Sequence, residues 1–158
     1  METVKRRDGG TYEQAMMLCP TARSFEFRRP LELASLRAGD VIVDFPSGGS
    51  YLRPYLDEIC PRAICHPVEH VPTYIENDGT ILKGSWHHLP FGDQSVDVVL
   101  TLAAIHHVLS GREAFYRECH RVLRGDGRLI IADVEAGTSV DAFLSEFVGR
   151  YSHEGHEA

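Results

Sequence analysis

Short apolar runs alternate with amphipathic stretches along this 158-residue chain. The runs rich in β-branched and apolar residues are expected to form strands, and they cover residues 41–45, 63–69, 80–85, 96–104 and 127–134. The first run, VIVDF, is apolar almost throughout, which is typical of a parallel strand buried on both faces. Strands that alternate with helical segments predict an α/β fold with a doubly wound, mainly parallel sheet.

Helical spacing of apolar residues predicts the segments that connect these strands. Residues 12–19 and the leucines of 31–36 are expected to form two helices before the sheet, and residues 51–59 a short helix after the first strand. Ser110 and Glu113 form a capping-box pattern before the apolar face that runs from Phe115 to Leu123. Gly125 and Gly127 are expected to end that helix, and the apolar spacing of residues 140–151 predicts one more.

Proline interrupts one of the expected strands. Pro67 lies within residues 63–69, and a proline cannot donate a hydrogen bond to a neighbouring strand. We therefore expect this strand to be short or broken.

Charge and composition exclude several classes of protein. The chain has 16 Lys and Arg against 23 Asp and Glu, a net charge of −7, whereas nucleic-acid binders usually present a basic surface. Its most apolar stretch, VDVVLTLAAI, is shorter than the roughly 20 residues that a membrane-spanning helix needs. No apolar signal-peptide core follows the charged first residues, so a cytoplasmic protein without nucleic-acid or membrane partners is expected. The four cysteines form no CxxC pair, which indicates reduced thiols.

Candidate binding residues follow the expected strands. In an open parallel sheet, ligands bind at the carboxyl ends of the strands. The turn from Asp44 to Ser50 contains Gly48 and Gly49, so its backbone can approach a ligand closely and its amides favour an anionic group. Glu69 ends the second strand, where a carboxylate can accept hydrogen bonds from two ribose hydroxyls. A plain tight turn and a surface glutamate are the alternative interpretations.

Four stretches together resemble a known family. They are VIVDFPSGGS, PVEH, GSWHHLPFGDQSVDVVLTLAAIHHV and FYRECHRVLRGDGRLIIADV, within residues 31 to 134. Their order and spacing resemble the class I S-adenosylmethionine-dependent methyltransferases, particularly the small-molecule type. The resemblance implies a Rossmann-like fold, S-adenosylmethionine as cofactor, S-adenosylhomocysteine as product and a small-molecule acceptor.

The resemblance also implies roles for single residues. The methionine part of the cofactor would be held by Asp44 and by the backbone of Pro46, Ser47, Gly48 and Gly49. Glu69 would bind the ribose hydroxyls, with His70 beside it, and Ser85 and Trp86 would lie by the adenine. Leu102 and Ala103 would border the site. Pro46 and Ser50 replace two of the family's three glycines, and Ser85 replaces its usual aspartate.

Two adjacent histidines are candidates for a general base. His106 and His107 follow the fourth strand, and imidazole titrates near working pH, which suits removal of a proton from a hydroxyl or amine. Adjacent side chains point in different directions, so at most one would face a substrate; packing or capping is the alternative for both. The nine histidines form no HExxH or paired Cys/His spacing, so no metal site is expected.

The chain supplies five of the seven strands that the family commonly has. We expect one domain over residues 1–158, with helices in 1–38, the cofactor-binding core in 39–134 and a helix and tail in 135–158. The fifth strand would have an open edge, which proteins usually cover. A fragment of a longer protein is the favoured explanation; a natural minimal form and a homo-oligomer that covers the edge are the others.

Three functions are compatible with these residues. The first is methyl transfer from S-adenosylmethionine to a small-molecule O, N or C nucleophile. The second is a non-catalytic nucleotide-binding or interaction module that keeps the fold. A nicotinamide oxidoreductase is the third, and it depends only on the shared strand, turn and helix.

Overall fold

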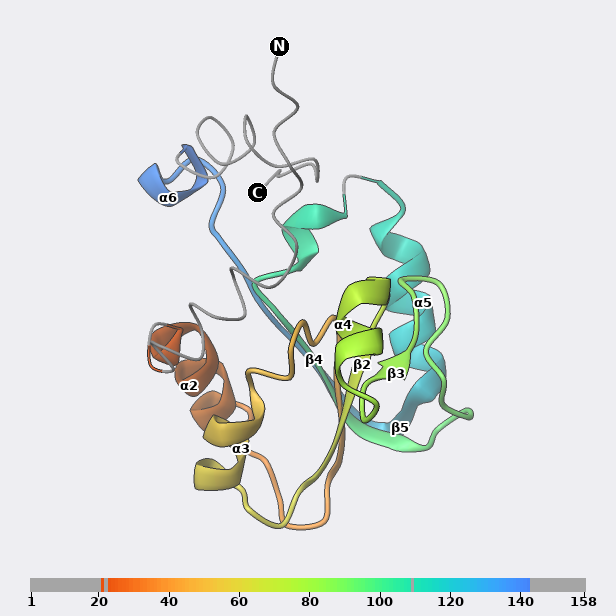
Figure 1. The fold of residues 1–158 in the computed structure, drawn as a ribbon. Helices are drawn as coiled ribbons and strands as arrows, with labels where there is room; N and C mark the ends of the chain where they lie inside the picture. Colours follow the sequence, from red (N-terminus) through yellow and green to blue (C-terminus); the bar gives the residue numbers. More distant parts are fainter. Residues whose placement is uncertain (1–20, 22, 109, 143–158) are drawn as a thin grey trace.

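One parallel sheet organises the molecule. The computed structural model describes residues 21, 23–108 and 110–142. Within them five strands lie in the order β3-β2-β1-β4-β5, and every neighbouring pair is parallel (Figure 1). Their bounds are β1 (Val41–Asp44), β2 (Ile64–Glu69), β3 (Leu82–Lys83), β4 (Val96–Leu102) and β5 (Leu123–Ala132). The order reverses between β1 and β4, which confirms the predicted doubly wound α/β architecture.

Helices cover both faces of this sheet. On one side lie α2 (Ser24–Leu33) and α3 (Arg53–Ile59), and on the other lies α5 (Arg112–Val122) (Figure 1). Shorter elements are α4 (Pro72–Asn77), the 3₁₀ turn η1 (Ile105–His107) and α6 (Ser139–Ala142). The helix predicted at 12–19 and most of the one predicted at 140–151 lie outside the described residues.

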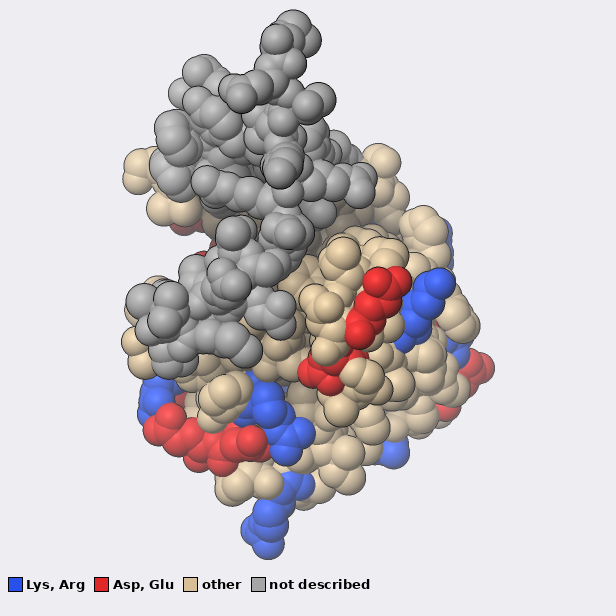
Figure 2. Space-filling view, viewed as in Figure 1, with Lys and Arg blue, Asp and Glu red and all other residues tan. Residues whose placement is uncertain are grey.

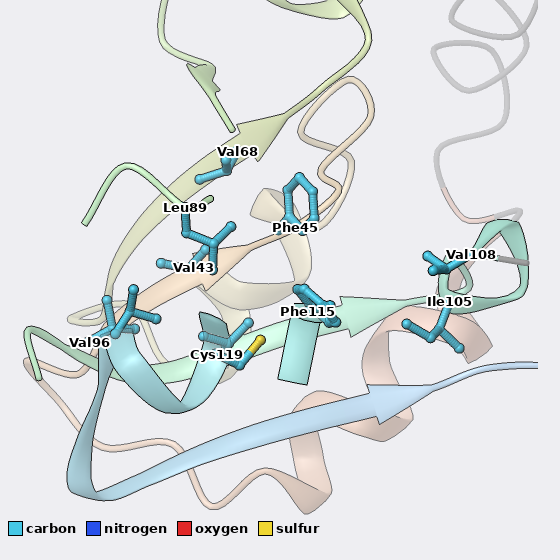
Figure 3. Packing of buried hydrophobic residues seen from close by; sticks show 11 residues of the cluster. Val43, Phe45, Val68, Leu89, Val96, Ile105, Val108, Phe115 and Cys119 are labelled. Atoms are coloured by element: carbon cyan, nitrogen blue, oxygen red, sulfur yellow. The ribbon is translucent and has the colours of Figure 1, made fainter. Parts of the chain in front are cut away.

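The apolar residues of the strands alternate between two cores. Ile42 of β1 packs with α2 and α3, whereas Val43 faces α5. Figure 3 shows the second core, in which Phe45 and Val43 lie against Phe115 and Cys119 of α5. Phe45 and Phe115 are fully buried, and complete burial of such a side chain contributes about 1.5–3 kcal/mol. The helix face predicted from Phe115 is therefore confirmed as far as Val122, whereas Leu123 begins β5 instead of ending the helix.

Pro67 does not break its strand, contrary to our expectation. The Glu69 carbonyl accepts a hydrogen bond from the Gly84 amide, on the side of β2 that faces β3. Backbone groups two residues apart in a strand point to the same side, so the Pro67 nitrogen also points toward β3. β3 pairs only with Val68 and Glu69, so no strand faces the Pro67 nitrogen. The missing amide costs no ladder bond, and β2 continues through the proline.

One helix was missed and two local predictions were wrong. The helix α4 was not predicted, although Pro72 at its first turn is a start signal. Gly111, with a left-handed backbone (φ 76°), caps α5 without a side-chain hydrogen bond, so the capping box of Ser110 and Glu113 does not form. Gly125 lies within β5, because pairing with β4 continues the strand from Leu123.

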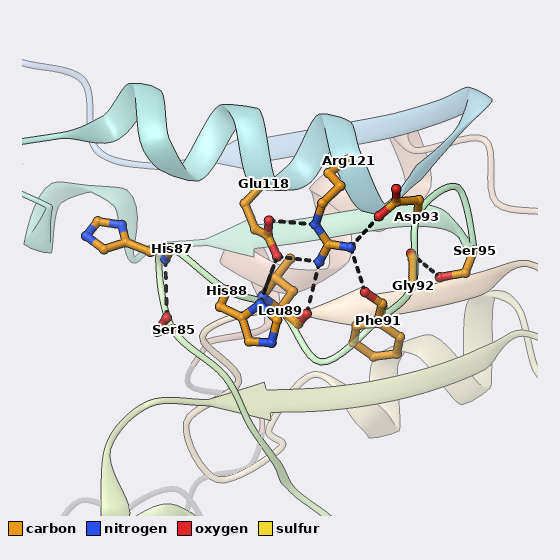
Figure 4. A network of polar contacts seen from close by, with 10 residues as sticks. All are labelled: Ser85, His87, His88, Leu89, Phe91, Gly92, Asp93, Ser95, Glu118 and Arg121. Atoms are coloured by element: carbon orange, nitrogen blue, oxygen red, sulfur yellow. Dashed lines mark hydrogen bonds and ion pairs between the residues drawn. The ribbon is translucent and has the colours of Figure 1, made fainter.

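A partly buried ion pair between Glu118 and Arg121 fixes the loop between β3 and β4. The Glu118 carboxylate accepts hydrogen bonds from the Leu89 amide at 2.7 Å and from the Arg121 guanidinium at 2.6 and 2.8 Å. Arg121 in turn donates to the carbonyl of Phe91 and to the Asp93 carboxylate (Figure 4). These bonds hold the loop against α5, so that β4 enters the sheet at a defined place.

The surface carries charges of both signs. Figure 2 shows acidic and basic side chains next to one another on one face of the described part. No helix among the described residues has the length and apolar character needed to cross a membrane. Three cysteines lie among them as free thiols, and burial raises the pKa of Cys65 and Cys119 to about 12.

Candidate active site

Four strands end around one cavity. Asp44 is the last residue of β1, Glu69 of β2 and Leu102 of β4, and Val134 lies two residues after the end of β5. A cavity of about 540 Å³ lies at this edge of the sheet. Predicted site residues that line it are Asp44, Pro46, Ser47, Gly48, Glu69, His70, Leu102, Ala103, His106 and His107. The strand order thus gathers residues that are far apart in the sequence, as expected for an open parallel sheet.

Asp44 is a buried acid on this cavity. Its residue is 5% exposed, and β1 lies between Pro67 of β2 and Leu100 of β4 at its position. Burial, reinforced by the negative charge of Glu69 and opposed by Arg23, raises the pKa of Asp44 to about 7. No residue among those described donates a hydrogen bond to its carboxylate. A cationic group would therefore be favoured beside it.

Glu69 is ionised and held by backbone amides. Its Oε1 accepts hydrogen bonds from the amides of His70 (2.6 Å) and Val71 (3.0 Å), and its Oε2 from the amide of Gly48 (2.8 Å). The His70 Nδ1 lies 2.9 Å from Oε1. Burial acts to raise the pKa of Glu69, but the hydrogen bonds from His70, Val71 and Gly48 outweigh it and lower the pKa.

The turn after β1 brings backbone to the cavity wall. Ser47 donates its amide to the Val68 carbonyl at 2.9 Å, and Gly48 donates to Glu69, so both amides are already engaged. Gly48 has a φ of 54°, a left-handed conformation that glycine adopts without strain. The Tyr51 ring lies against Gly49, since a Cβ there would be 2.7 Å from the tyrosine Cζ. The turn can therefore contact a ligand through its backbone surface and carbonyl groups. Its Ser47 and Gly48 amides are already hydrogen-bonded within the protein.

The structure does not bring Ser85, Trp86 or Gly49 to the lining of the cavity. Ser85 closes a tight turn, with its amide bonded to the His88 carbonyl at 2.8 Å and its hydroxyl accepting from the His87 amide. The Trp86 ring packs edge-on against Phe45, at a centroid distance of 4.8 Å, and contacts the core around α5. Their contact with an adenine remains a prediction.

The two candidate histidines differ in their surroundings. His106 is buried, and its Nδ1 lies 2.7 Å from Oδ1 of Asp133. His107 is half-buried, and its ring centroid lies 4.1 Å from that of His106. Both line the cavity. Ala103, just before them, has a φ of 50°, a strained conformation for a residue with a side chain.

Several cavity residues were not predicted from the sequence. Arg23, Tyr51 and Tyr74 line the cavity, and no sequence pattern singled them out. Asp133, which contacts the cavity residue His106, was also missed, although it follows an apolar strand as Asp44 and Glu69 do, and that shared position is a signal for it. Among the described residues, no group of three or more His, Cys, Asp or Glu side chains is placed to hold a metal ion.

Comparison with known proteins identifies a family. Residues 44–131, more than half of the chain, match the family model described as "Methyltransferase domain". An uncharacterized methyltransferase, YcgJ of Bacillus subtilis, is 32% identical over 127 residues, which is 75% of this chain and 49% of that protein. A demethylmenaquinone methyltransferase of Thermotoga maritima is 42% identical over 57 residues, 36% of this chain and 24% of that protein. The chain spans about half the length, or less, of these curated relatives.

Solved structures agree on the fold. The crystal structure of the Bacillus YcgJ protein superimposes with a TM-score of 0.65 at 21% identity and covers 85% of this chain and 62% of that one. A SAM-dependent methyltransferase of Thermotoga maritima, described as a possible histamine N-methyltransferase, gives 0.68 at 19% identity and covers 96% and 72%. With a parallel sheet whose strand ends surround one cavity, and with the family match over residues 44–131, the chain belongs to the methyltransferase domain family and has the fold of class I S-adenosylmethionine-dependent methyltransferases.

Proposed function

We propose that this chain binds S-adenosylmethionine, the cofactor that its family implies, and transfers the methyl group to a small-molecule O, N or C nucleophile. One observation carries the proposal. Two buried acids, Asp44 and Glu69, end adjacent strands and face the same cavity beside Gly48. Two neighbouring acids of this kind would favour a ligand that carries a positive charge and several hydroxyl groups.

Asp44 fits the amino group of the cofactor. Its carboxylate has no hydrogen-bond donor among the described residues, and burial disfavours its charge. An ammonium group would supply both a donor and a positive charge, which stabilises the ionised acid. Arg23 lines the same cavity and is ion-paired with Glu26, so a ligand carboxylate bound beside it would share its guanidinium with that acid.

Glu69 fits the ribose through one oxygen. Its Oε1 already receives two amides and the His70 ring, whereas its Oε2 receives only Gly48. Ribose hydroxyls would therefore meet Oε2. His70 and Tyr74 also line the cavity, and their aromatic rings would supply contacts for a purine.

The chemistry of methyl transfer asks mainly for alignment. When bound, the cofactor would supply a methyl group on a positively charged sulfur, and sulfur is the leaving group when a nucleophile attacks the methyl carbon in line. Correct positioning of two reactants contributes on the order of 7–11 kcal/mol to the lowering of a barrier. The residues of this chain would therefore bind the cofactor, orient it and leave one side of the cavity to the acceptor.

A small-molecule acceptor agrees with the charge and with two relatives. The net charge of −7 disfavours nucleic acid as the acceptor. The Thermotoga relative is named for demethylmenaquinone, and one similar structure is described as a possible histamine N-methyltransferase. These names support the class of acceptor and do not choose a member.

A non-catalytic module is the second candidate. The Tyr51 ring lies against Gly49, and Pro46 stands where the resemblance to the family implies a glycine. If these features prevent productive binding, the chain would keep the fold without turnover.

Calorimetric titration of the 158-residue chain tests the proposal. Saturable binding of S-adenosylmethionine and S-adenosylhomocysteine, with none of NAD, is the expected result. Asp44→Asn should weaken binding at least about 10-fold, since it removes a charged partner worth roughly 1.5–3 kcal/mol. Asp93→Asn, an exposed acid outside the cavity, is the matched control and should bind normally. A folded chain that binds neither sulfur compound would reject the proposal.

A further inference from the structure

His106 and Asp133 form a buried pair at the ends of two adjacent strands. The register of β4 and β5 places Leu102 beside Ala132, and each partner follows shortly after. The Nδ1 of His106 and the Oδ1 of Asp133 are 2.7 Å apart, and their side chains are 8% and 9% exposed. The His106 side chain therefore lies on the cavity wall, and Asp133 contacts it from the end of β5.

Backbone amides hold Asp133 in place. Its Oδ2 accepts from the amides of Ala104 (2.9 Å) and His106 (3.3 Å), and its Oδ1 from the amide of Val134 (2.8 Å). Burial acts to raise the pKa of Asp133, but the hydrogen bonds from His106 and Val134 lower it below its ordinary value. The carboxylate is thus ionised near neutral pH and can only accept hydrogen bonds.

This arrangement fixes the tautomer of the imidazole. Because an ionised carboxylate offers no proton, Nδ1 of His106 must be the donor in the 2.7 Å contact. A neutral ring that donates through Nδ1 carries its lone pair on Nε2. Proton acceptance at Nε2 would then create an imidazolium ion whose positive charge faces the Asp133 carboxylate.

Building on the proposed methyl transfer, we propose that Nε2 of His106 takes the proton of the acceptor and that Asp133 positions the ring. The acceptor class follows from this role: it is an O–H, N–H or acidic C–H compound that must lose a proton. A nucleophile without such a proton, such as a thioether, would gain nothing from the pair.

The step is balanced in atoms and electrons. As the new bond from the nucleophile to the methyl carbon forms, the bond from that carbon to sulfur breaks and its electron pair stays on sulfur. The X–H proton passes to Nε2 of His106, and the X–H electron pair remains on the nucleophile. The imidazolium then releases the proton to water, which restores the neutral ring.

Other charged groups line the same cavity and would contribute to any pH dependence measured there. They are Arg23 and Glu26 near the start of α2, Asp44 of β1, Glu69 of β2 with His70 after it, and His107 on η1. The pH profile of each variant is therefore compared with the titration of His106 itself, measured in the same protein.

NMR spectroscopy of the ¹⁵N-histidine-labelled chain, with S-adenosylhomocysteine bound, tests the geometry without any turnover. Long-range ¹H–¹⁵N spectra should show His106 as the Nδ1–H tautomer. In Asp133→Asn the population of that tautomer should fall while the other described histidines keep theirs. A purely structural Asp133 would lower stability and leave the tautomer unchanged, which would overturn the proposal.

Transfer of a labelled methyl group to phenol, benzylamine and acetylacetone tests the chemistry, with dimethyl sulfide as a nucleophile that has no proton to lose. His106→Asn keeps a donor near the position of Nδ1 and removes Nε2, so it should retain the Asp133 contact and lower kcat at least about 100-fold for proton-bearing acceptors. Asp133→Asn should lower kcat at least about 10-fold. His120→Gln, an exposed histidine on α5, is the matched control and should be unaffected.

The outcomes separate the two proposals. Support requires that the acidic limb of the kcat profile coincide with the midpoint of the His106 titration and that S-adenosylhomocysteine affinity be unchanged in His106→Asn. Full turnover by His106→Asn, loss of turnover only in His107→Gln, or equal losses with dimethyl sulfide would overturn the role of His106. Cofactor binding by the wild-type chain without methylation of any proton-bearing acceptor would overturn it too. Absence of cofactor binding would instead reject the proposed function.

Discussion

The Glu69 carboxylate accepts a hydrogen bond from the Gly48 amide at 2.8 Å, and this bond joins the end of β2 to the turn that follows β1. The same side chain receives the amides of His70 and Val71, so it fixes backbone on both sides of the cavity. Glu69 is thus a structural acid as well as a candidate ligand for ribose, and the two roles use different oxygens.

Glu69→Ala should lower stability as well as cofactor affinity. Three backbone amides lose their acceptor, and leaving buried donors unsatisfied should cost about 2 kcal/mol or more. Urea denaturation measures this loss. Glu69→Gln keeps one acceptor oxygen and should fall between the alanine variant and wild type. An alanine variant with wild-type stability would show that water replaces the carboxylate at no cost.

Asp44→Asn should stabilise the chain at high pH. Asp44 has an ordinary pKa of 3.8 and a pKa of about 7 in the folded state, so the folded state binds more protons between these values. Stability contributed by the protonated acid is therefore lost as pH rises from about 4 through 7. The asparagine variant does not pay the cost of a buried charge, so its free energy of unfolding at pH 8 should exceed that of wild type by roughly 1–3 kcal/mol. A shift of one pKa unit corresponds to about 1.4 kcal/mol.

The measurement is the free energy of unfolding at pH 5 and pH 8 for wild type and Asp44→Asn. The difference between the two proteins should be larger at pH 8. A constant difference would mean that Asp44 titrates normally, and the cause assigned to it, burial beside Glu69, would be wrong.

Glu118→Ala should destabilise the fold without any change at the cavity. It removes the acceptor for the Leu89 amide and leaves Arg121 without its nearest carboxylate. A loss of about 2 kcal/mol is expected in urea denaturation, less than for a fully buried pair because Arg121 is partly exposed. Asp93→Ala removes only the exposed end of the network and should cost less than about 1 kcal/mol. Equal losses in both variants would contradict this ranking.

Residues next to one another in the sequence explain which parts of the molecule could be predicted. The apolar runs at Val41–Asp44 and Val96–Leu102 predict buried strands, and acids at strand ends predict a ligand-binding site. Each of these patterns lies within a few consecutive residues, so the sequence alone shows it. The same reasoning located Asp44 and Glu69 on the cavity.

Features that depend on pairing between distant segments could not be predicted. Gly125 has the sequence signal of a helix end, but it lies in β5 because that strand pairs with β4 from Leu123 onward. The contact of His106 with Asp133 joins residues 27 positions apart and exists only because β4 and β5 are adjacent. The Trp86 ring packs edge-on against Phe45 and Phe115 at centroid distances of 4.8 and 5.0 Å, contacts that join three segments far apart in the sequence.

Gly49 and Tyr51 should be energetically coupled. Gly49 does not have a left-handed backbone, so alanine is acceptable there except for one contact: its Cβ would lie 2.7 Å from the Cζ and hydroxyl oxygen of Tyr51. Gly49→Ala must push the ring away and should cost about 1–3 kcal/mol, as overpacking does. In a Tyr51→Ala background the contact is gone, and the same substitution should cost less than about 0.5 kcal/mol.

A double-mutant cycle in urea measures this coupling. Titration of the same variants with S-adenosylhomocysteine measures whether the Tyr51 ring affects cofactor binding. If the Tyr51 ring narrows the cavity beside the turn, Tyr51→Ala should bind S-adenosylhomocysteine at least as tightly as wild type, because its ring lines the cavity and contributes no bond that the proposal requires. Weaker binding by Tyr51→Ala would show instead that the ring is a cofactor contact. Additive effects in the cycle would mean that the cost of Gly49→Ala does not arise from contact with the Tyr51 ring.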